Sequence, residues 1–223
     1  MITYEQFINE GVYDLNIFKA VFMAGGPGSG KTHIADRTAG GLGLKAINSD
    51  DPFEIYLKKE GLSLKMPDSE TAERDPLRAK AKRVTVKKQA LAVEGRLGLL
   101  IDGTGHEYDK VSKRAAELNQ LGYETSMIFV NTSLEVSLAR NQKRTRSVQP
   151  SLVKKSWKDV QANMGKYQSF FGPANFFIVD NNGVEQDMLE ISTKHIRRAI
   201  VKPVKNVIAL AWIENEMKKK KRT

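Results

Sequence analysis

The chain contains no cysteine, and only three histidines and two tryptophans occur among its 223 residues. The absence of cysteine excludes disulfides, thiolate zinc sites and thiol nucleophiles, and it suits a reducing cytoplasm. His33, His106 and His195 are too scattered for a metal site, so we interpret them as surface or core residues. No run of about 18 apolar residues and no cationic leader is present, so we expect neither a membrane span nor a secretory signal.

Negative charge is in deficit. The chain has 36 Lys and Arg against 26 Asp and Glu, a net charge of +10. Half of this excess lies in the tail, residues 218–222, and further basic residues crowd positions 78–88 and 140–158. Such a balance favours a polyanionic partner, nucleic acid above all. A lysine-rich tail is also an ordinary solvated end, so the charge alone leaves nucleic-acid binding open.

One segment matches the phosphate-binding loop pattern Gly-x-x-x-x-Gly-Lys-[Ser/Thr] at every required position. A strand-like apolar run precedes it and a run with helical spacing follows it, as the motif requires. The glycines let backbone N–H groups turn inward and form an anion cradle at the start of a helix. We therefore predict that this loop binds ATP, with Lys31 on the β- and γ-phosphates and Thr32 on Mg²⁺. The loop consists of Gly25, Gly26, Pro27, Gly28, Ser29, Gly30, Lys31 and Thr32.

Two aspartates follow further predicted strands. The short strand 44–48 leads into Asp50, and the buried strand 98–101 leads into Asp102. In an open parallel sheet, side chains just past the carboxyl ends of the strands face the ligand crevice. We therefore predict that Asp50 is a catalytic carboxylate beside the γ-phosphate. Helix capping ahead of Pro52 is the alternative role, and both can hold at once. Asp102 has the position of a Walker B carboxylate, which helps to hold Mg²⁺ through its water shell.

The residue after Asp102 narrows the class of reaction that the protein can catalyse. Gly103 stands where many P-loop ATPases carry a glutamate that activates water, and no Asn-Lys-x-Asp guanine-reading motif occurs. These absences argue against a motor ATPase and a GTPase, and they leave a kinase that transfers the phosphoryl group to a hydroxyl. Arg140 and Arg144, in a predicted lid around residues 140–150, are candidates for neutralising the transferring group. Arg146 ranks below them, and a solvated role at a helix end is the alternative for all three.

The remaining patterns predict a three-layer α/β sandwich of the P-loop NTPase type with a parallel sheet. We expect a polar loop over the site at 62–75 and a basic helix at 76–97, whose cations form a solvated face or line an acceptor groove. A helix at 152–171 carries an aromatic stripe that we interpret as core or interface, with a base-stacking platform as the alternative. Residues 16–183 would form the core, and residues 184–223 a helical C-terminal appendage with a basic tail.

Residues 1–15 lie outside the predicted core. Tyr4, Phe7 and Ile8 share a helical face, which predicts a short amphipathic helix. The segment also resembles the N-terminal capsid-targeting peptides of internal virion proteins in tailed phages. In addition, residues 8–10 resemble the Ile/Leu-x-Glu site that their prohead protease cuts. This resemblance implies cleavage after Glu10 and packaging in the virion.

Taken together, the motifs resemble those of the zeta-toxin-like P-loop kinases, a branch that is also similar to the kinase domain of phage polynucleotide kinase. The matching segments are residues 25–32, 47–50, 100–104 and 140–146, within a region of roughly residues 17–180. The resemblance implies that Asp50 is the general base for the acceptor hydroxyl, that Lys31 and the lid arginines stabilise phosphoryl charge, and that Thr32 and Asp102 manage Mg²⁺. The chain further resembles zeta-toxin-type proteins of large tailed phages, which implies the cytoplasm of an infected bacterium.

One departure from the family pattern concerns the acceptor. The relatives often place an arginine a few residues after the base, whereas Pro52, Phe53 and Glu54 follow here. The acceptor of the relatives therefore cannot be assigned to this chain from the resemblance. The leading hypothesis is a kinase for a hydroxyl of a nucleotide, a nucleic acid or a nucleotide sugar. The alternatives are a zeta-toxin-type UDP-N-acetylglucosamine kinase, and a nucleic-acid-binding or packaged virion protein that binds ATP without turnover.

Overall fold

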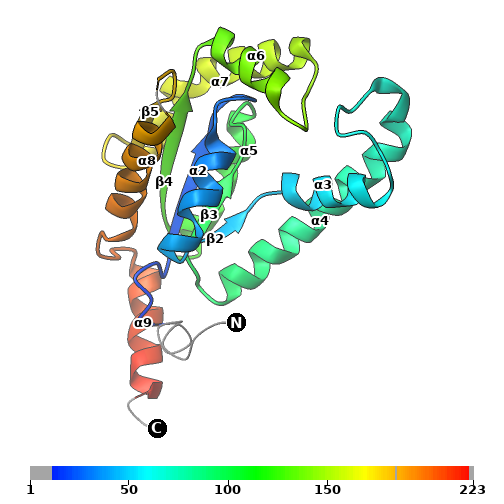
Figure 1. Cartoon of the computed structure of the whole chain (residues 1–223). Coiled ribbons are helices and arrows are strands. Elements are labelled where there is room, and N and C mark those ends of the chain that lie inside the picture. The colour runs from blue at the N-terminus through cyan, green and yellow to red at the C-terminus, as the bar shows by residue number, and fades with distance from the viewer. Residues whose placement is uncertain (1–11, 184, 221–223) are drawn as a thin grey trace.

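The computed structural model describes residues 12–183 and 185–220, and its centre is a parallel five-stranded sheet. The strand order is β2-β3-β1-β4-β5, so the strand that leads into the phosphate-binding loop is central (Figure 1). Every residue of this strand is buried, as expected for a strand covered on both faces. The predicted parallel sheet is thereby confirmed. The strands are β1 Lys19–Ala24, β2 Lys45–Ile47, β3 Leu99–Asp102, β4 Glu124–Asn131 and β5 Phe176–Asp180.

Helices connect the parallel strands, because each crossover must return to the same end of the sheet. Two short 3₁₀ helices, Gly40–Leu42 and Asp68–Glu70, lie within these connections. The α-helices of the described chain are α2 Lys31–Thr38, α3 Asp50–Lys59, α4 Thr71–Glu94, α5 Tyr108–Gln120, α6 Leu134–Lys143, α7 Pro150–Phe171, α8 Glu185–Ile200 and α9 Val207–Lys220.

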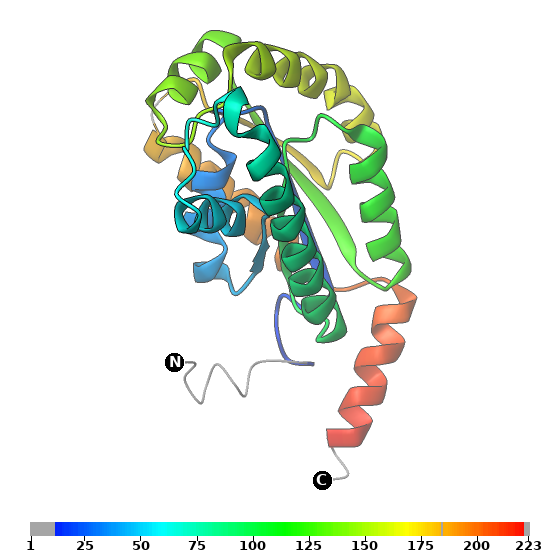
Figure 2. The same cartoon turned by 90° about the vertical axis from the view of Figure 1, so that its right-hand side faces the viewer.

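Alternate strand residues point to opposite faces, and two hydrophobic cores result. Phe22 and Phe129 belong to the core under α5 and α7, whereas Val21 and Ile128 belong to the core under α2 and α8. Figure 2 shows the sheet between these layers of helices. Of the stripe on α7, Val160 and Tyr167 belong to the first core, as interpreted, whereas Trp157 belongs to neither core.

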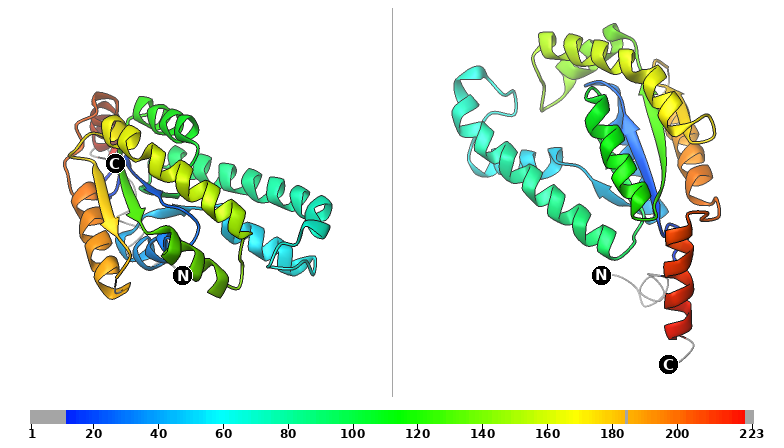
Figure 3. Two further views of the ribbon diagram at one scale, coloured as in Figure 1. Left: turned by 90° about the horizontal axis from the view of Figure 1, so that it is seen from above. Right: turned by 180° about the vertical axis from the view of Figure 1, so that it is seen from behind.

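The segment with α3 and α4 forms an arm beside the β2 edge of the sheet (Figure 3). The arm has a small core of its own, with Phe53 and Leu57 of α3 packed against Ala81 of α4. Helix α4 begins at Thr71, five residues before the start that the sequence pattern predicts, and Pro76 lies inside it. Proline removes one helical hydrogen bond there, but its fixed φ suits a helix. The arm places the first turn of α3 at the carboxyl end of β2.

The predicted helical C-terminal part is confirmed, and its two helices differ in their surroundings. Helix α8 packs on the sheet through Met188 and Ile196, which are buried in the second core. Helix α9 stands away from the sheet at the end opposite the phosphate-binding loop, where Trp212 contacts Phe18 edge to face (Figure 1). Among the described residues, no helix has the length and apolarity needed to cross a bilayer. The predicted N-terminal amphipathic helix and cleavage site lie outside the described residues.

Candidate active site

The phosphate-binding loop adopts backbone conformations that require glycine at two positions. Gly28 has φ 83° and Gly30 has φ 91°, in the left-handed region that side chains rarely allow. A Cβ on Gly28 would also overlap the carbonyl oxygen of Ser137 in α6, and one on Gly30 would overlap the amide nitrogen of Asn181. The loop therefore packs against α6 and the end of β5, and it leads into the first turn of α2 at Lys31.

Residues from two other segments contact this loop. The side-chain amide of Asn181, after β5, donates to the carbonyl of Ser29 at 2.6 Å. Trp157 of α7 lies beside Gly26, and its indole N–H donates to the carbonyl of Thr132 at 2.8 Å. No local pattern singles out Asn181, because its role depends on the position of β5 beside β4. The anion cradle is thus supported by the folded core and not by local sequence alone.

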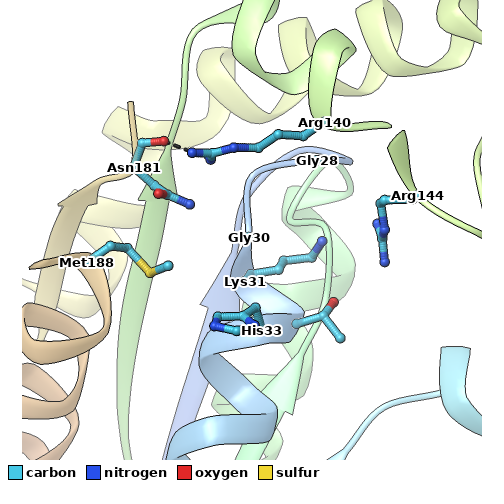
Figure 4. Close-up of a pocket in the computed structure, with 9 residues that line it drawn as sticks. Gly28, Gly30, Lys31, His33, Arg140, Arg144, Asn181 and Met188 are labelled. Atoms are coloured by element: carbon cyan, nitrogen blue, oxygen red, sulfur yellow. Dashed lines mark hydrogen bonds between the residues drawn. The ribbon is translucent and has the colours of Figure 1, made fainter. Parts of the chain in front are cut away.

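A cavity of about 240 Å³ opens at the loop (Figure 4). It is lined by Gly28, Gly30, Lys31, Thr32, His33, Arg140, Arg144, Asn181 and Met188. The guanidinium of Arg140 donates to the backbone carbonyl of Asn181 at 2.8 Å, above the loop. Arg144 lies on the other side of the loop. The structure therefore brings both predicted lid arginines, Arg140 of α6 and Arg144 directly after it, to the cavity that Lys31 lines.

The side chains of Thr32 and Asp102 meet beneath the loop. The Thr32 hydroxyl donates to one carboxylate oxygen of Asp102 at 3.2 Å, and the other oxygen is buried without a partner in the described chain. Burial raises the pKa of Asp102, and the neighbouring Lys31 opposes this rise. No group of three or more His, Cys, Asp or Glu among the described residues could hold a metal by itself. A cation here would need phosphate or water oxygens as well, which is how Mg²⁺ usually binds. The buried, unpartnered oxygen fits such a cation.

Asp50 stands at the first position of α3, and its carboxylate is held by two arginines. Arg78 of α4 donates to one oxygen at 2.7 Å, and Arg146 lies 2.8 Å from the other. Burial would raise the pKa of Asp50, but Arg146 and Arg78 together lower it to about 2. The side chain is therefore ionised at neutral pH. The N-cap residue of α3 is Ser49, which makes no side-chain cap bond, and the backbone N–H of Asp50 donates to the side chain of Asn48 at 2.7 Å. The alternative of helix capping by Asp50 is therefore wrong.

A second cavity, of about 270 Å³, lies around Asp50 and Asp102. Lys31 lines this cavity as well as the one at the loop. The structure therefore places the loop lysine between a space next to the phosphate cradle and a space next to an ionised carboxylate. Such an arrangement allows a charged group to be transferred from a ligand in one space to a ligand in the other, next to the positive charge of Lys31. Further lining residues include Asn48, Arg78, Thr104, His106, Lys110 and Arg114.

Two arginines have a larger part in the site than sequence reasoning assigned to them. Arg146, ranked below Arg140 and Arg144, is the lid arginine that contacts Asp50, and its side chain is 10% exposed. Arg78 was one of many cations on a basic helix. Its guanidinium lies 4.4 Å from the ring centre of Phe53, three residues after Asp50. Phe53 thus orients an arginine that arrives from α4.

Comparison with known proteins agrees with these features. The family model for Zeta toxin matches residues 18–185, a range that includes the loop, Asp50, Asp102 and the lid arginines. The chain belongs to the Zeta toxin family. As a member of this family it has the P-loop kinase fold, which solved structures support. No curated protein sequence matches it.

Three solved structures illustrate the likeness of this Zeta toxin family member to P-loop kinases. A putative kinase from Chloroflexus aurantiacus has a TM-score of 0.57 at 19% identity, over 82% of this chain and 98% of the other. A structure of the PezAT toxin–antitoxin system of Streptococcus pneumoniae gives 0.53 at 19% identity, over 84% and 92%. Shikimate kinase from Acinetobacter baumannii gives 0.52 at 17% identity, over 86% and 99%. At these identities the likeness shows the fold.

Proposed function

We propose that the protein is an ATP- and Mg²⁺-dependent kinase that transfers the γ-phosphoryl group to a hydroxyl of a nucleotide, a nucleic acid or a nucleotide sugar. The observation that carries this proposal is the position of Lys31, which borders both the cavity at the phosphate-binding loop and the cavity around Asp50. Membership of the Zeta toxin family and the P-loop kinase fold support it.

In the proposed reaction, the backbone N–H groups of Gly28, Gly30 and the first turn of α2 bind the phosphates of ATP, and Lys31 offsets their charge. Arg140 and Arg144 add positive charge from the lid side of the cavity. The acceptor oxygen forms a bond to the γ-phosphorus as the bond to the leaving ADP oxygen breaks. The proton of the acceptor hydroxyl passes to a carboxylate oxygen of Asp50. Mg²⁺, held by Thr32 and Asp102, would supply further neutralisation of the β- and γ-phosphates.

The two arginines on Asp50 define its part in this reaction. A carboxylate with a pKa of about 2 is ionised and accepts a hydrogen bond well, but it is a weak base. In phosphoryl transfer through a loose transition state, the hydroxyl needs orientation more than early deprotonation. Asp50 therefore orients the acceptor hydroxyl first and takes its proton late in the transfer. Release of Arg146 toward the phosphates would raise the pKa of Asp50 and strengthen it as a base.

The test is phosphate transfer from γ-labelled ATP to a panel of 5′-hydroxyl DNA and RNA, nucleosides, nucleoside monophosphates and UDP-N-acetylglucosamine. Lys31→Ala serves as the blank, and a parallel arm replaces Mg²⁺ with EDTA. We expect a labelled product that disappears in the blank and in EDTA. ATP binding without any labelled product would instead favour the alternative in which the chain is a nucleic-acid-binding or virion protein without turnover.

The zeta-toxin-type activity on UDP-N-acetylglucosamine is the second candidate, and the family match favours it. The residues after Asp50 count against assigning that substrate from the family alone, because Phe53 occupies the stretch where the family often has an arginine. Arg78 of α4 partly replaces the positive charge of that arginine, since it contacts the carboxylate of Asp50. Labelling of this sugar nucleotide alone in the panel would decide for the toxin-type activity.

We also propose a tailed-phage origin, with the protein in the cytoplasm of the infected bacterium or packaged in the virion. Support comes from the N-terminal residues 1–11, which resemble capsid-targeting peptides and lie outside the described structure. Intact-mass measurement of protein from purified virions provides the test. We expect a chain that begins at Gly11, and one that still begins at Met1 would exclude processing at this site.

A further inference from the structure

The cavity around Asp50 adjoins a larger groove between α4 and α5. The groove has a volume of about 900 Å³, and Ser49, Lys110 and Arg114 line both spaces. Figure 3 shows the two helices diverging toward the site. An acceptor whose hydroxyl reaches Asp50 therefore has room to extend along the groove, past Arg114.

The cations around the Asp50 cavity differ in how their charge is compensated. Arg78 and Arg146 share the carboxylate of Asp50, and Lys110 lies 3.2 Å from a carboxylate oxygen of Glu107. Lys31 faces the phosphate-binding loop as well. Arg114 forms no ion pair within the described part of the chain, and its hydrogen-bond acceptor is the neutral side-chain amide of Gln89. Arg114 is thus the cation at the entrance of the groove that lacks a contacting carboxylate.

Burial makes incomplete compensation of this charge costly. The side chain of Arg114 is half-buried, and burial lowers the pKa of its guanidinium. The charge of Glu117, on the same helix, opposes this lowering but forms no ion pair with Arg114 in the described chain. A guanidinium offers five N–H donors in a planar fork, and one acceptor from Gln89 leaves most of them unused. Such a group binds oxyanions in a bidentate manner, and an oxyanion would complete the compensation. The position of Arg114 therefore indicates an anionic ligand.

The groove beyond Arg114 indicates what else the ligand carries. Its floor is aliphatic and includes Val86 and Val93 of α4 and Leu121 after α5. Its charged lining residues are predominantly basic, namely Lys82, Lys110, Lys113 and Arg114 against Glu94 and Glu117. An aliphatic floor packs against the face of a sugar or base, and lysines favour further phosphate. A small carboxylate acceptor would leave this groove unused.

We infer that Arg114 binds a phosphate group of the acceptor, next to the reacting hydroxyl, and that the kinase prefers phosphate-bearing acceptors with a nucleoside body over neutral hydroxyl compounds. This inference rests on the proposed kinase function. A nucleotide sugar and the 5′-hydroxyl end of a nucleic-acid strand both present this chemistry, and the test below separates them.

The test uses acceptors that differ in one phosphate group. Thymidine is compared with thymidine 3′-monophosphate, which keeps the free 5′-hydroxyl, and N-acetylglucosamine with UDP-N-acetylglucosamine. Oligothymidylates of increasing length with a 5′-hydroxyl form a third series, and shikimate and gluconate represent carboxylate acceptors. We expect kcat/KM to be higher for the phosphate-bearing member of a pair by about ten- to a hundredfold. A gain with oligothymidylate length identifies a strand as the source, and labelling of the sugar nucleotide alone identifies the nucleotide sugar.

The variants test the residue. Arg114→Gln should remove the preference mainly through KM, and Arg114→Lys should retain part of it. Arg83→Gln is the matched control, since Arg83 is an exposed arginine of α4 that lines none of these spaces. Thermal melting shows whether the variants fold. If Arg83→Gln reduces the preference for phosphate-bearing acceptors as much as Arg114→Gln does, the general positive charge is responsible and the inference is overturned.

A titration separates this inference from the proposed function. Thymidine 3′-monophosphate is titrated into Lys31→Ala protein with and without Arg114→Gln, and we expect about tenfold weaker binding when Arg114 is replaced. Equal labelling of the neutral and phosphate-bearing members would keep the kinase and overturn the inference. An absence of labelling with every acceptor would overturn the proposed function, and the titration would still decide whether Arg114 binds phosphate.

Discussion

At the scale of single residues, Asp50 carries the proposed chemistry, and its exchange for asparagine isolates the carboxylate. Asp50→Asn keeps the shape of the side chain but removes the proton acceptor and the charge that Arg78 and Arg146 contact. We expect phosphate transfer to fall by about 10²- to 10⁴-fold, while ATP affinity stays nearly unchanged because Asp50 does not line the nucleotide cavity. Single-turnover transfer and equilibrium ATP binding measure the two effects. Transfer at the wild-type rate would show that the mechanism is wrong.

A second prediction concerns the pH dependence of the ion pair between Asp50 and Arg146. The pKa of Asp50 is about 2 in the folded protein against an ordinary value of 3.8. A lowered folded-state pKa stabilises the fold above the ordinary value, and this contribution is lost as the pH falls through the folded value. Arg146→Gln should therefore lower the free energy of unfolding above about pH 4, and its difference from wild type should shrink toward pH 2.

Urea unfolding of both proteins between pH 2 and pH 6 measures this difference, and carboxyl NMR should show a higher pKa for Asp50 in Arg146→Gln. Arg144→Gln is a suitable control, because Arg144 lines the nucleotide cavity and has no ion pair with Asp50 in the described chain. A gap between wild type and Arg146→Gln that stays constant across the whole pH range would contradict the assignment.

The residues of the site differ in how far the sequence could predict them. The loop residues 25–32 were predictable, because consecutive residues form the cradle and the motif states each role. Asp50 and Asp102 followed from their positions at the ends of predicted strands, and Thr32 does contact Asp102. Arg78 and Arg146 were not assigned to Asp50, because their contacts depend on how α4 and the lid segment pack in three dimensions. No local pattern distinguishes Arg78 from the other cations of its helix.

At the scale of elements, the contact between the phosphate-binding loop and α6 determines the shape of the cradle. Gly28→Ala adds a Cβ at φ 83°, where it would overlap the carbonyl oxygen of Ser137. We expect at least about 1 kcal/mol of destabilisation and a clear loss of ATP affinity, since the loop or α6 must shift. Gly165→Ala is the control, because it adds a Cβ on helix α7 with no atom within 4 Å. ATP affinity equal to wild type in Gly28→Ala would show that the loop accommodates the methyl group.

The elements themselves show why some boundaries were predictable and others were not. The strands β1 and β3 are apolar apart from Lys19 at the start of β1 and Asp102 at the end of β3, so both could be located from composition. The start of α4 was predicted at Pro76, because proline is common in the first turn of a helix, but the helix begins at Thr71. In the extra turn, Arg74 donates to the backbone carbonyl of Pro67 at 2.9 Å and to the hydroxyl of Thr71 at 3.0 Å. These contacts hold the turn before Pro76, and the proline signal alone did not indicate them.

At the scale of the whole molecule, the net charge of +10 sets the expected response to salt. In the described tail, Lys218 pairs with Glu214 and Lys219 with Glu216, each at 2.6 Å. Exposed pairs of this kind contribute little to stability, so a nucleic-acid phosphate can replace the glutamate at small cost. Each phosphate contact releases condensed counterions, and the logarithm of the binding constant then falls linearly with the logarithm of salt concentration.

Removal of residues 218–222 should therefore weaken nucleic-acid binding and flatten its salt dependence, by roughly 0.7 in slope for each lost contact with a single strand. Fluorescence anisotropy with a labelled oligothymidylate at several salt concentrations measures the slope. A variant with Glu214→Gln and Glu216→Gln is the complementary control, since it removes the carboxylates that Lys218 and Lys219 contact and should steepen the slope. If truncation leaves both affinity and slope unchanged, the tail is a solvated end, and any binding belongs to the basic surfaces of the arm and the α4–α5 groove.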